Sequence, residues 1–89
     1  MKPIARKNDL EIKEDTGELF IRDLRNSKAI CLNPTSAYVW QKCDGRKDTD
    51  EIAKEMQEEL GVPVSEDLVS LALDRLSSAR LLEFNPQFA

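Results

Sequence analysis

Hydrophobic and polar residues alternate near the start of the chain. Leu10 and Ile12 alternate with charged residues, and a second apolar stretch at residues 19–21 follows the pair Thr16-Gly17. A period of two indicates strands, and Thr16-Gly17 fits the turn of an antiparallel hairpin. After a polar Arg-Asn-Ser break, a third short strand is expected, which would lie at a sheet edge. The expected strands are residues 9–13, 18–24 and 28–32.

Beyond Leu32 the period changes to about 3.6, which indicates helices. Polar residues suited to N-caps precede each expected helix: Asn33 followed by Pro34, Asp48 with Glu51 as a capping box, and Ser65. Gly45 and Gly61 are expected to end the first two helices. The expected helices are residues 34–43, 49–60 and 66–79.

Apolar residues at helical spacing are expected to face a common core. They are Ala37, Trp40 and Cys43 in the first helix, Ile52, Ala53, Met56 and Leu60 in the second, and Leu68, Leu71, Ala72, Leu76 and Ala79 in the third. Residues 81–84 are expected to close the domain as an extended tail or short strand. The pattern predicts one α+β domain over residues 1–89, a three-stranded antiparallel sheet followed by three helices, similar to a winged helix-turn-helix.

Length and charge narrow the function. A chain of 89 residues supports one modest core. Its 13 basic and 17 acidic residues give a net charge of -4, which repels nucleic-acid phosphates. The sequence has no apolar run long enough to span a bilayer and no hydrophobic stretch after Met1 typical of a signal peptide. We therefore expect a cytoplasmic protein with no membrane partner.

The sequence shows no arrangement of residues typical of a catalytic site. The chain has no histidine, and Cys31 and Cys43 are isolated, so two buried thiols are expected rather than a metal half-site or disulfide. Residues 44–48 lack the spacing of a calcium loop or P-loop and are interpreted as an interhelical turn. Trp40 is interpreted as a core aromatic. We predict no enzyme activity, no cofactor and no metal.

Glutamates of the second helix do not change that prediction. Glu55, Glu58 and Glu59 lie on the side opposite its apolar stripe. Charged residues in such positions are normally a solvated surface rather than a catalytic pair.

The fold class leaves DNA binding as an alternative, because winged helix-turn-helix domains include DNA-binding regulators. The third helix, which would enter a groove, carries Glu66, Asp67 and Asp74 against two basic residues, Arg75 and Arg80. This balance disfavours contact with phosphates.

The edge strand points to peptide binding. An edge strand exposes unpaired N–H and C=O groups. A foreign extended peptide can pair with them, and so can a second copy of the chain in a homodimer. Ile30 and Leu32 are expected on one face of the strand, and the small residues Ala29 and Cys31 on the other. The small side chains would leave room for ligand side chains.

One segment resembles a known family. Residues 32–45 combine a strand ending in Leu32-Asn33, a helix carrying Ala37 and Trp40, and a following Asp44-Gly45. With the N-cap before Glu51-Ile52-Ala53 and Leu81-Leu82 after the last helix, the order and spacing are similar to the PqqD-like family over residues 3–84.

The resemblance implies a role as a recognition element for ribosomally synthesised, modified peptides. Such domains bind the leader of a precursor peptide as an added strand beside the third strand and the third helix, and deliver the core to a tailoring enzyme. The partner enzyme would be a radical SAM enzyme, a cyclase or a leader peptidase. The implied peptide-binding residues are Lys28, Ala29, Ile30, Cys31 and Leu32 on the strand, and Asp67, Leu71, Asp74, Arg75 and Ser78 on the helix.

Residues 19–26 differ from authentic PqqD proteins of pyrroloquinoline quinone synthesis. Those proteins usually have a longer, more hydrophobic second strand with a Tyr-Pro-Glu-Gly type turn, whereas this chain has Leu-Phe-Ile-Arg-Asp-Leu-Arg-Asn. We therefore expect another peptide pathway, with a lasso, radical-SAM-modified or thioether peptide as product, and keep quinone synthesis as the alternative.

Overall fold

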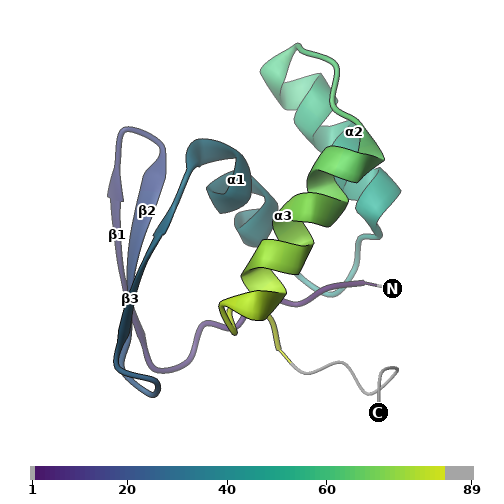
Figure 1. The fold of residues 1–89 in the computed structure, drawn as a ribbon. Helices are drawn as coiled ribbons and strands as arrows, with labels where there is room; N and C mark the ends of the chain where they lie inside the picture. Colours follow the sequence, from purple (N-terminus) through teal and green to yellow (C-terminus); the bar gives the residue numbers. More distant parts are fainter. Residues whose placement is uncertain (1, 84–89) are drawn as a thin grey trace.

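The fold is a three-stranded antiparallel sheet followed by three helices that cover one face of the sheet (Figure 1). This computed structural model describes residues 2–83. It confirms the predicted α+β class. The elements are β1 (Leu10–Asp15), β2 (Glu18–Asp23), β3 (Lys28–Leu32), α1 (Pro34–Lys42), α2 (Thr49–Leu60) and α3 (Glu66–Ser78).

The sheet has the order β1-β2-β3, which leaves β1 and β3 as its two edges. Thr16 and Gly17, with φ angles of 49° and 84°, form the predicted hairpin turn between β1 and β2. The bounds of β3 match the prediction, whereas β1 begins one residue later and ends two residues later than expected. Asp9 cannot start the strand because its φ of 59° lies outside the extended region. β2 ends at Asp23 rather than residue 24.

The N-caps and the end of α2 follow the prediction, whereas the C-cap of α1 is Cys43, two residues before the predicted Gly45. Asn33 Oδ1 accepts a hydrogen bond from Ser36 N at 2.8 Å, and Ser65 Oγ accepts one from Leu68 N at 3.2 Å. Gly61 ends α2 in the left-handed region with φ 69°. α2 has the predicted bounds, whereas α1 and α3 end one residue earlier than expected because Cys43 and Ala79 are their C-caps. Local side-chain chemistry therefore sets the ends of the helices.

The core lies between the inner face of the sheet and the helices, with α1 in contact with β2, β3, α2 and α3. Trp40 is its largest buried side chain, as predicted for a core aromatic, and its Nε1 donates to Leu81 O at 2.9 Å. Ala37 and Cys43 are buried beside it, also as predicted. The other buried apolar residues include Leu19, Ile21 and Leu32 from the sheet, Ile52, Ala53 and Met56 from α2, and Val69, Ala72, Leu73 and Leu76 from α3.

Three apolar residues predicted to face the core are exposed instead. Leu60, Leu68 and Leu71 have exposed fractions of 52%, 41% and 49%. The buried side of α3 includes Val69 and Leu73. Leu68 and Leu71 lie outside that side, so the apolar surface of α3 is wider than the part that neighbouring elements cover. Leu60 lies in the last turn of α2. α3 therefore presents an uncovered apolar side chain, Leu71, to solvent.

An N-terminal segment that the sequence pattern did not predict joins the two ends of the helical layer. Ala5 N donates to Cys43 O at 2.8 Å, and Arg6 N donates to Leu81 O at 2.8 Å. Leu82 forms the expected short extended segment through a β-bridge to Ala5, and Phe84 lies outside the described residues. This segment holds the chain after α3 in place.

A buried carboxylate fixes the turn before β3. Asp23 Oδ1 lies 2.9 Å from Arg6 Nη2 and accepts hydrogen bonds from Arg25 N and Asn26 N at 3.0 and 3.1 Å. Asn26 Nδ2 donates to Asp23 Oδ2 at 2.8 Å. The Asn26 side-chain bond, with the Arg6 guanidinium, holds the pKa of Asp23 well below its ordinary value of 3.8, although burial opposes this shift.

Replacing Asp23 should make the protein less stable at neutral pH and less sensitive to acid. Because the folded pKa of Asp23 is depressed, its stabilising contribution is complete above the unfolded value of 3.8 and is lost as pH falls towards the folded pKa. Urea unfolding, followed by Trp40 fluorescence from about pH 7 to about pH 2, tests this in wild type and Asp23→Asn. The pKa values of Asp44 and Glu59 are also lowered, so the difference between the two curves isolates Asp23. Parallel curves would contradict the prediction.

Candidate functional site

The backbone of β3 has a free outer edge formed by Ala29 and Cys31. Asp15 and Glu18 close the two-residue hairpin as a hydrogen-bonded pair. From that pair, every second residue of β2 forms backbone hydrogen bonds with β1, and the residues between them form theirs with β3. Leu24 N donating to Asp9 O at 2.9 Å agrees with this alternation. By the register of β2 and β3, Lys28, Ile30 and Leu32 bond to β2. The N–H and C=O groups of Ala29 and Cys31 therefore point away from the sheet.

The side chains of β3 divide between the two faces as predicted. Leu32 is buried and Ile30 half-buried on the inner face, while Ala29 and Cys31 are exposed on the outer face. The expectation that both cysteines are buried was wrong for Cys31. It lies opposite the exposed Phe20 on the outer face of the sheet, which the helices do not cover. The outer side of β3 therefore carries small side chains open to solvent.

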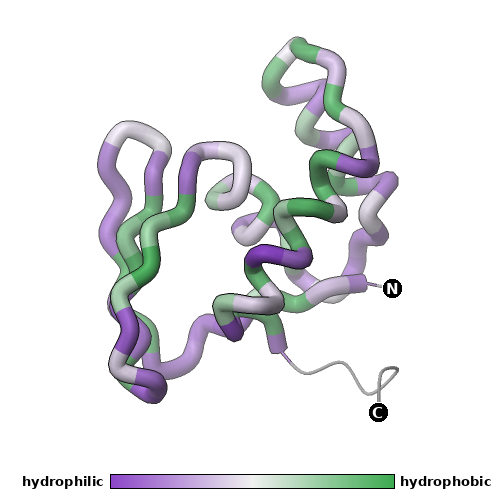
Figure 2. The backbone as a smooth tube through the Cα atoms, in the orientation of Figure 1, coloured by the Kyte–Doolittle hydropathy of each residue, from purple (hydrophilic) through white to green (hydrophobic). Residues whose placement is uncertain are grey.

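The two edges of the sheet differ in chemistry. β1 carries Glu11, Lys13, Glu14 and Asp15, and Figure 2 shows its half nearest the hairpin turn in purple. Charged side chains on an edge strand discourage pairing with another chain. β3 has one charged residue, Lys28. By this criterion β3 is the edge open to an added strand.

The α3 residues implied by the family resemblance share one exposed side of the helix. At about 100° per residue they fall within roughly 100° of its circumference. Leu71 supplies the apolar surface, and Arg75 the positive charge. All five are exposed: Asp67, Leu71, Asp74, Arg75 and Ser78. Together with Lys28–Leu32 they form what we call the β3–α3 face.

β3 and α3 both pack against α1, and their backbones lie apart from each other. Among the described residues, no Cα of β3 lies within 8 Å of a Cα of α3. Figure 1 shows α3 on the helical side of the sheet, with α1 behind it. The two elements are thus positioned relative to each other through α1 and the common core.

The outer face of the sheet carries a shallow hollow of about 520 Å³. Phe20 and Arg22 of β2 border it, together with Ala29 and Cys31 of β3. Its lining belongs to the sheet alone, so it is not a cavity between β3 and α3. It adjoins the free edge of β3, where side chains of an added strand could reach it.

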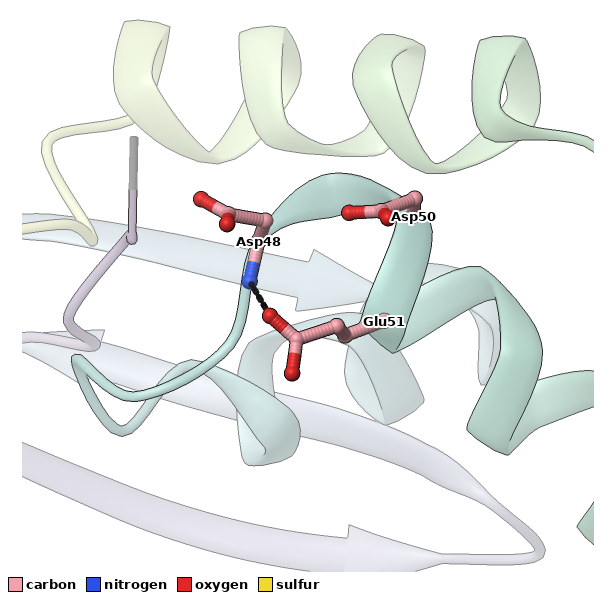
Figure 3. Close-up of side chains that lie close together, drawn as sticks. All are labelled: Asp48, Asp50 and Glu51. Carbon is pink, nitrogen blue, oxygen red and sulfur yellow. Dashed lines mark hydrogen bonds between the residues drawn. The ribbon is translucent and has the colours of Figure 1, made fainter.

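A cluster of carboxylates at the start of α2 is a helix cap. Figure 3 shows Asp48, Asp50 and Glu51 close together, with Asp48 N donating to Glu51 Oε1 at 3.1 Å. This is the predicted capping box, and acidic side chains at a helix N-terminus are favourable to the helix. The cluster is accounted for by its role in folding.

Glu55 and Glu59 take part in an ionic network between α1 and α2. Lys42 Nζ lies 3.0 Å from Glu59 Oε1 and 3.6 Å from Glu55 Oε1, and Tyr38 Oη donates to Glu59 Oε2. Burial, followed by this bond, raises the pKa of Tyr38 to about 12. These glutamates therefore join two helices rather than form a simple solvated face, while Glu58 is exposed as predicted.

The surroundings of Cys43 make its thiol unreactive. Its Sγ donates to Val39 O at 3.1 Å, and burial raises its pKa to about 12. At neutral pH it remains a thiol. The neighbouring residues 44–48 form the predicted interhelical turn between α1 and α2.

Comparison with known proteins identifies the family. The family model described as coenzyme PQQ synthesis protein D (PqqD) matches residues 18–82. The chain belongs to the PqqD family. A search of curated proteins found no match.

The likeness in fold to a solved structure extends beyond the residues that the family model matches. A solved structure, TbiB1 in complex with the TbiA(beta) leader peptide, aligns with a TM-score of 0.70. It is 17% identical and covers 92% of this chain and 98% of that chain. The likeness shows that the two share a fold, including the three-stranded sheet in front of the helices.

Two features of this PqqD-family chain were not predicted from the sequence. The outer-face Phe20 was read only as part of a strand, although alternation with the buried Leu19 and Ile21 places it outward. Arg6 gave no local signal, because its partner Asp23 is far away in sequence. No helix among the described residues is long and apolar enough to cross a membrane.

Proposed function

We propose that this chain binds the leader segment of a ribosomally synthesised precursor peptide by strand addition to β3, and presents the peptide to a tailoring enzyme. The free edge at Ala29 and Cys31 is the observation that carries the proposal. Each residue offers one donor and one acceptor, and each backbone hydrogen bond contributes about 0.5 to 1.5 kcal/mol net. Family membership supports a binding role rather than catalysis, and the leader-bound TbiB1 shares the fold.

Side chains on both sides of the added strand would fix its register. Alternate ligand residues would point towards α3, where Leu71 offers an exposed apolar surface, and towards the outer hollow beside Ala29 and Cys31. Burial of apolar ligand side chains gives about 25 cal/mol per Å². A free leader is disordered, so ordering it opposes these gains and limits the affinity.

The β3–α3 face carries two cations, which favour acidic leader residues close to them, and two carboxylates, Asp67 and Asp74, which disfavour them. Lys28 and Arg75 are both exposed. Exposed ion pairs usually contribute less than about 1 kcal/mol each. Lys28 and Arg75 would therefore affect which leader is preferred more than the overall affinity.

The proposal gives the class of biosynthetic pathway, defined by its tailoring enzyme. The tailoring partner would be a radical SAM enzyme, a cyclase or a leader peptidase, with a product other than pyrroloquinoline quinone. The alternative within the family is the quinone pathway itself. Finding which precursor peptide, among those encoded beside genes of these enzyme classes, binds the protein distinguishes the two.

Amide NMR with that leader peptide tests the binding mode. We expect chemical-shift changes at Lys28–Leu32 and on the exposed side of α3. Changes confined to α2, or no change with any leader encoded nearby, would refute the proposal. The DNA-binding alternative predicts salt-dependent retardation of random duplex; we expect none, because the acidic residues Glu66, Asp67 and Asp74 of α3 repel phosphates.

A further inference from the structure

A hollow lined by arginines lies where the β2–β3 turn meets the segment after α3. Its volume is about 370 Å³, and three guanidinium-bearing residues from separate parts of the chain border it, Arg6, Arg25 and Arg80. The remaining lining residues are Asn8, Asn26, Leu82 and Glu83. We call it the arginine hollow.

Arg6 brings an unsatisfied donor to this hollow. Its side chain is 9% exposed, and its Nε and Nη2 are buried without a hydrogen bond. Nη2 nevertheless lies 2.9 Å from Asp23 Oδ1 in an ion pair, so Nε is the donor that has no partner among the described residues. Buried donors without acceptors are rare in native proteins and call for a partner. Because these atoms are buried, a ligand with acceptor oxygens would reach them only if the Arg6 side chain turned towards the hollow.

Arg80 is the exposed cation of the hollow. It has no ion pair with another described residue, and its φ of 60° lies in the left-handed region. Its backbone N donates to Ser77 O at 3.0 Å, which ties its backbone to the end of α3. Arg25 is already paired, with Nη2 2.8 Å from Asp9 Oδ2. Arg80 is therefore the cation of the hollow that is open to a new acceptor, and the ion-paired Arg6 lies beside it.

The balance of charge defines the kind of ligand. Asp9 and Asp23 neutralise Arg25 and Arg6, and Glu83 also lines the hollow. The field of the site is thus weak, so a polyanion such as a nucleic-acid backbone gains little there. A single carboxylate would be held there by short-range hydrogen bonds from guanidinium donors rather than by the net charge of the site.

The hollow lies at one end of the β3–α3 face. Asn26 is two residues before Lys28, and Arg80 is two residues after Ser78. A peptide added antiparallel to β3, the commoner pairing, would run from Leu32 towards Lys28 and continue to the hollow. We infer that the arginine hollow binds an aspartate or glutamate side chain of the leader, just C-terminal to the segment paired with β3. This inference rests on the proposed function.

The test is a double-mutant cycle between Arg80→Gln and the acidic residues of the leader. Synthetic leader peptides, each with one Asp or Glu changed to Asn or Gln, are titrated against both proteins by calorimetry. We expect Arg80→Gln to weaken the unmodified peptide about fivefold, and to leave unchanged the affinity for one amide-substituted peptide. Arg46→Gln is the matched control, because the exposed Arg46 in the α1–α2 turn carries the same charge. It should bind every peptide as wild type does.

A second readout locates the ligand. The Nε–H resonance of Arg6 should shift with the carboxylate peptide and saturably with acetate alone, and Arg80→Gln should weaken both effects. If wild type and Arg80→Gln bind all peptides equally and acetate causes no saturable shift, the arginine hollow is not a carboxylate site, even though binding along β3 stands. If no leader peptide binds wild type, the proposed function and the leader as occupant both fail. Unfolding curves from Trp40 fluorescence confirm that the variants are folded.

Discussion

Proline at Ala29 or Cys31 should weaken leader-peptide binding at least about tenfold while the fold remains intact. Each substitution removes an N–H that points to the free edge, and leaves the bonds of Ile30 to β2 in place. The bound peptide then loses a hydrogen bond and keeps an unpaired carbonyl, an effect of about 1.5 to 4 kcal/mol in sum. Calorimetric titration of each variant with the leader peptide measures the loss.

Two controls separate strand addition from general damage to the sheet. Glu14→Pro places the same residue at an outward amide of β1, the charged edge, and should leave leader affinity unchanged. Ile30→Pro removes an amide that bonds to β2 and should unfold the domain more readily, as reported by Trp40 fluorescence. Unimpaired binding by both Ala29→Pro and Cys31→Pro would rule out strand addition at β3.

Local chemistry explains which parts of the fold could be predicted from the sequence. The Thr16-Gly17 turn, the Asn33 cap and the Asp48–Glu51 capping box each depend on residues a few positions apart. β3 was delimited correctly because polar turn residues and an N-cap flank it. Such signals survive in a single sequence, and they place the edge strand.

Burial of individual residues could not be predicted in the same way. Cys31 and Leu71 are apolar and periodic, yet which face of an element is covered depends on partners distant in the chain. The pairing of Arg6 with Asp23 was missed for the same reason, since the two residues lie 17 positions apart. The candidate site therefore emerged in two stages. The sequence predicted the edge strand β3 and the helix α3. The structure added which amides of β3 point outward and where the arginine hollow lies.

Leu71→Glu should weaken leader binding about a hundredfold, more than Leu71→Ala, for which about fivefold is expected. Leu71 is 49% exposed, so truncation removes only the apolar area that a ligand would cover, about 1 kcal/mol. A glutamate must in addition lose its hydration beside the apolar ligand residue, and that penalty is several times larger. Titration calorimetry of the two variants against the same peptide gives the ratio.

Val62→Glu is the matched control for Leu71→Glu. Val62 is 50% exposed, as Leu71 is, but it lies in the segment between α2 and α3 rather than on the β3–α3 face. The two variants have the same net charge and the same kind of substitution, so general electrostatic repulsion of an acidic leader weakens both equally. A loss specific to Leu71→Glu places the apolar anchor on α3. Equal affinities of Leu71→Glu and Val62→Glu would move the anchor elsewhere, most directly to the outer hollow beside Phe20, while the backbone pairing with β3 would still be required by the proline variants.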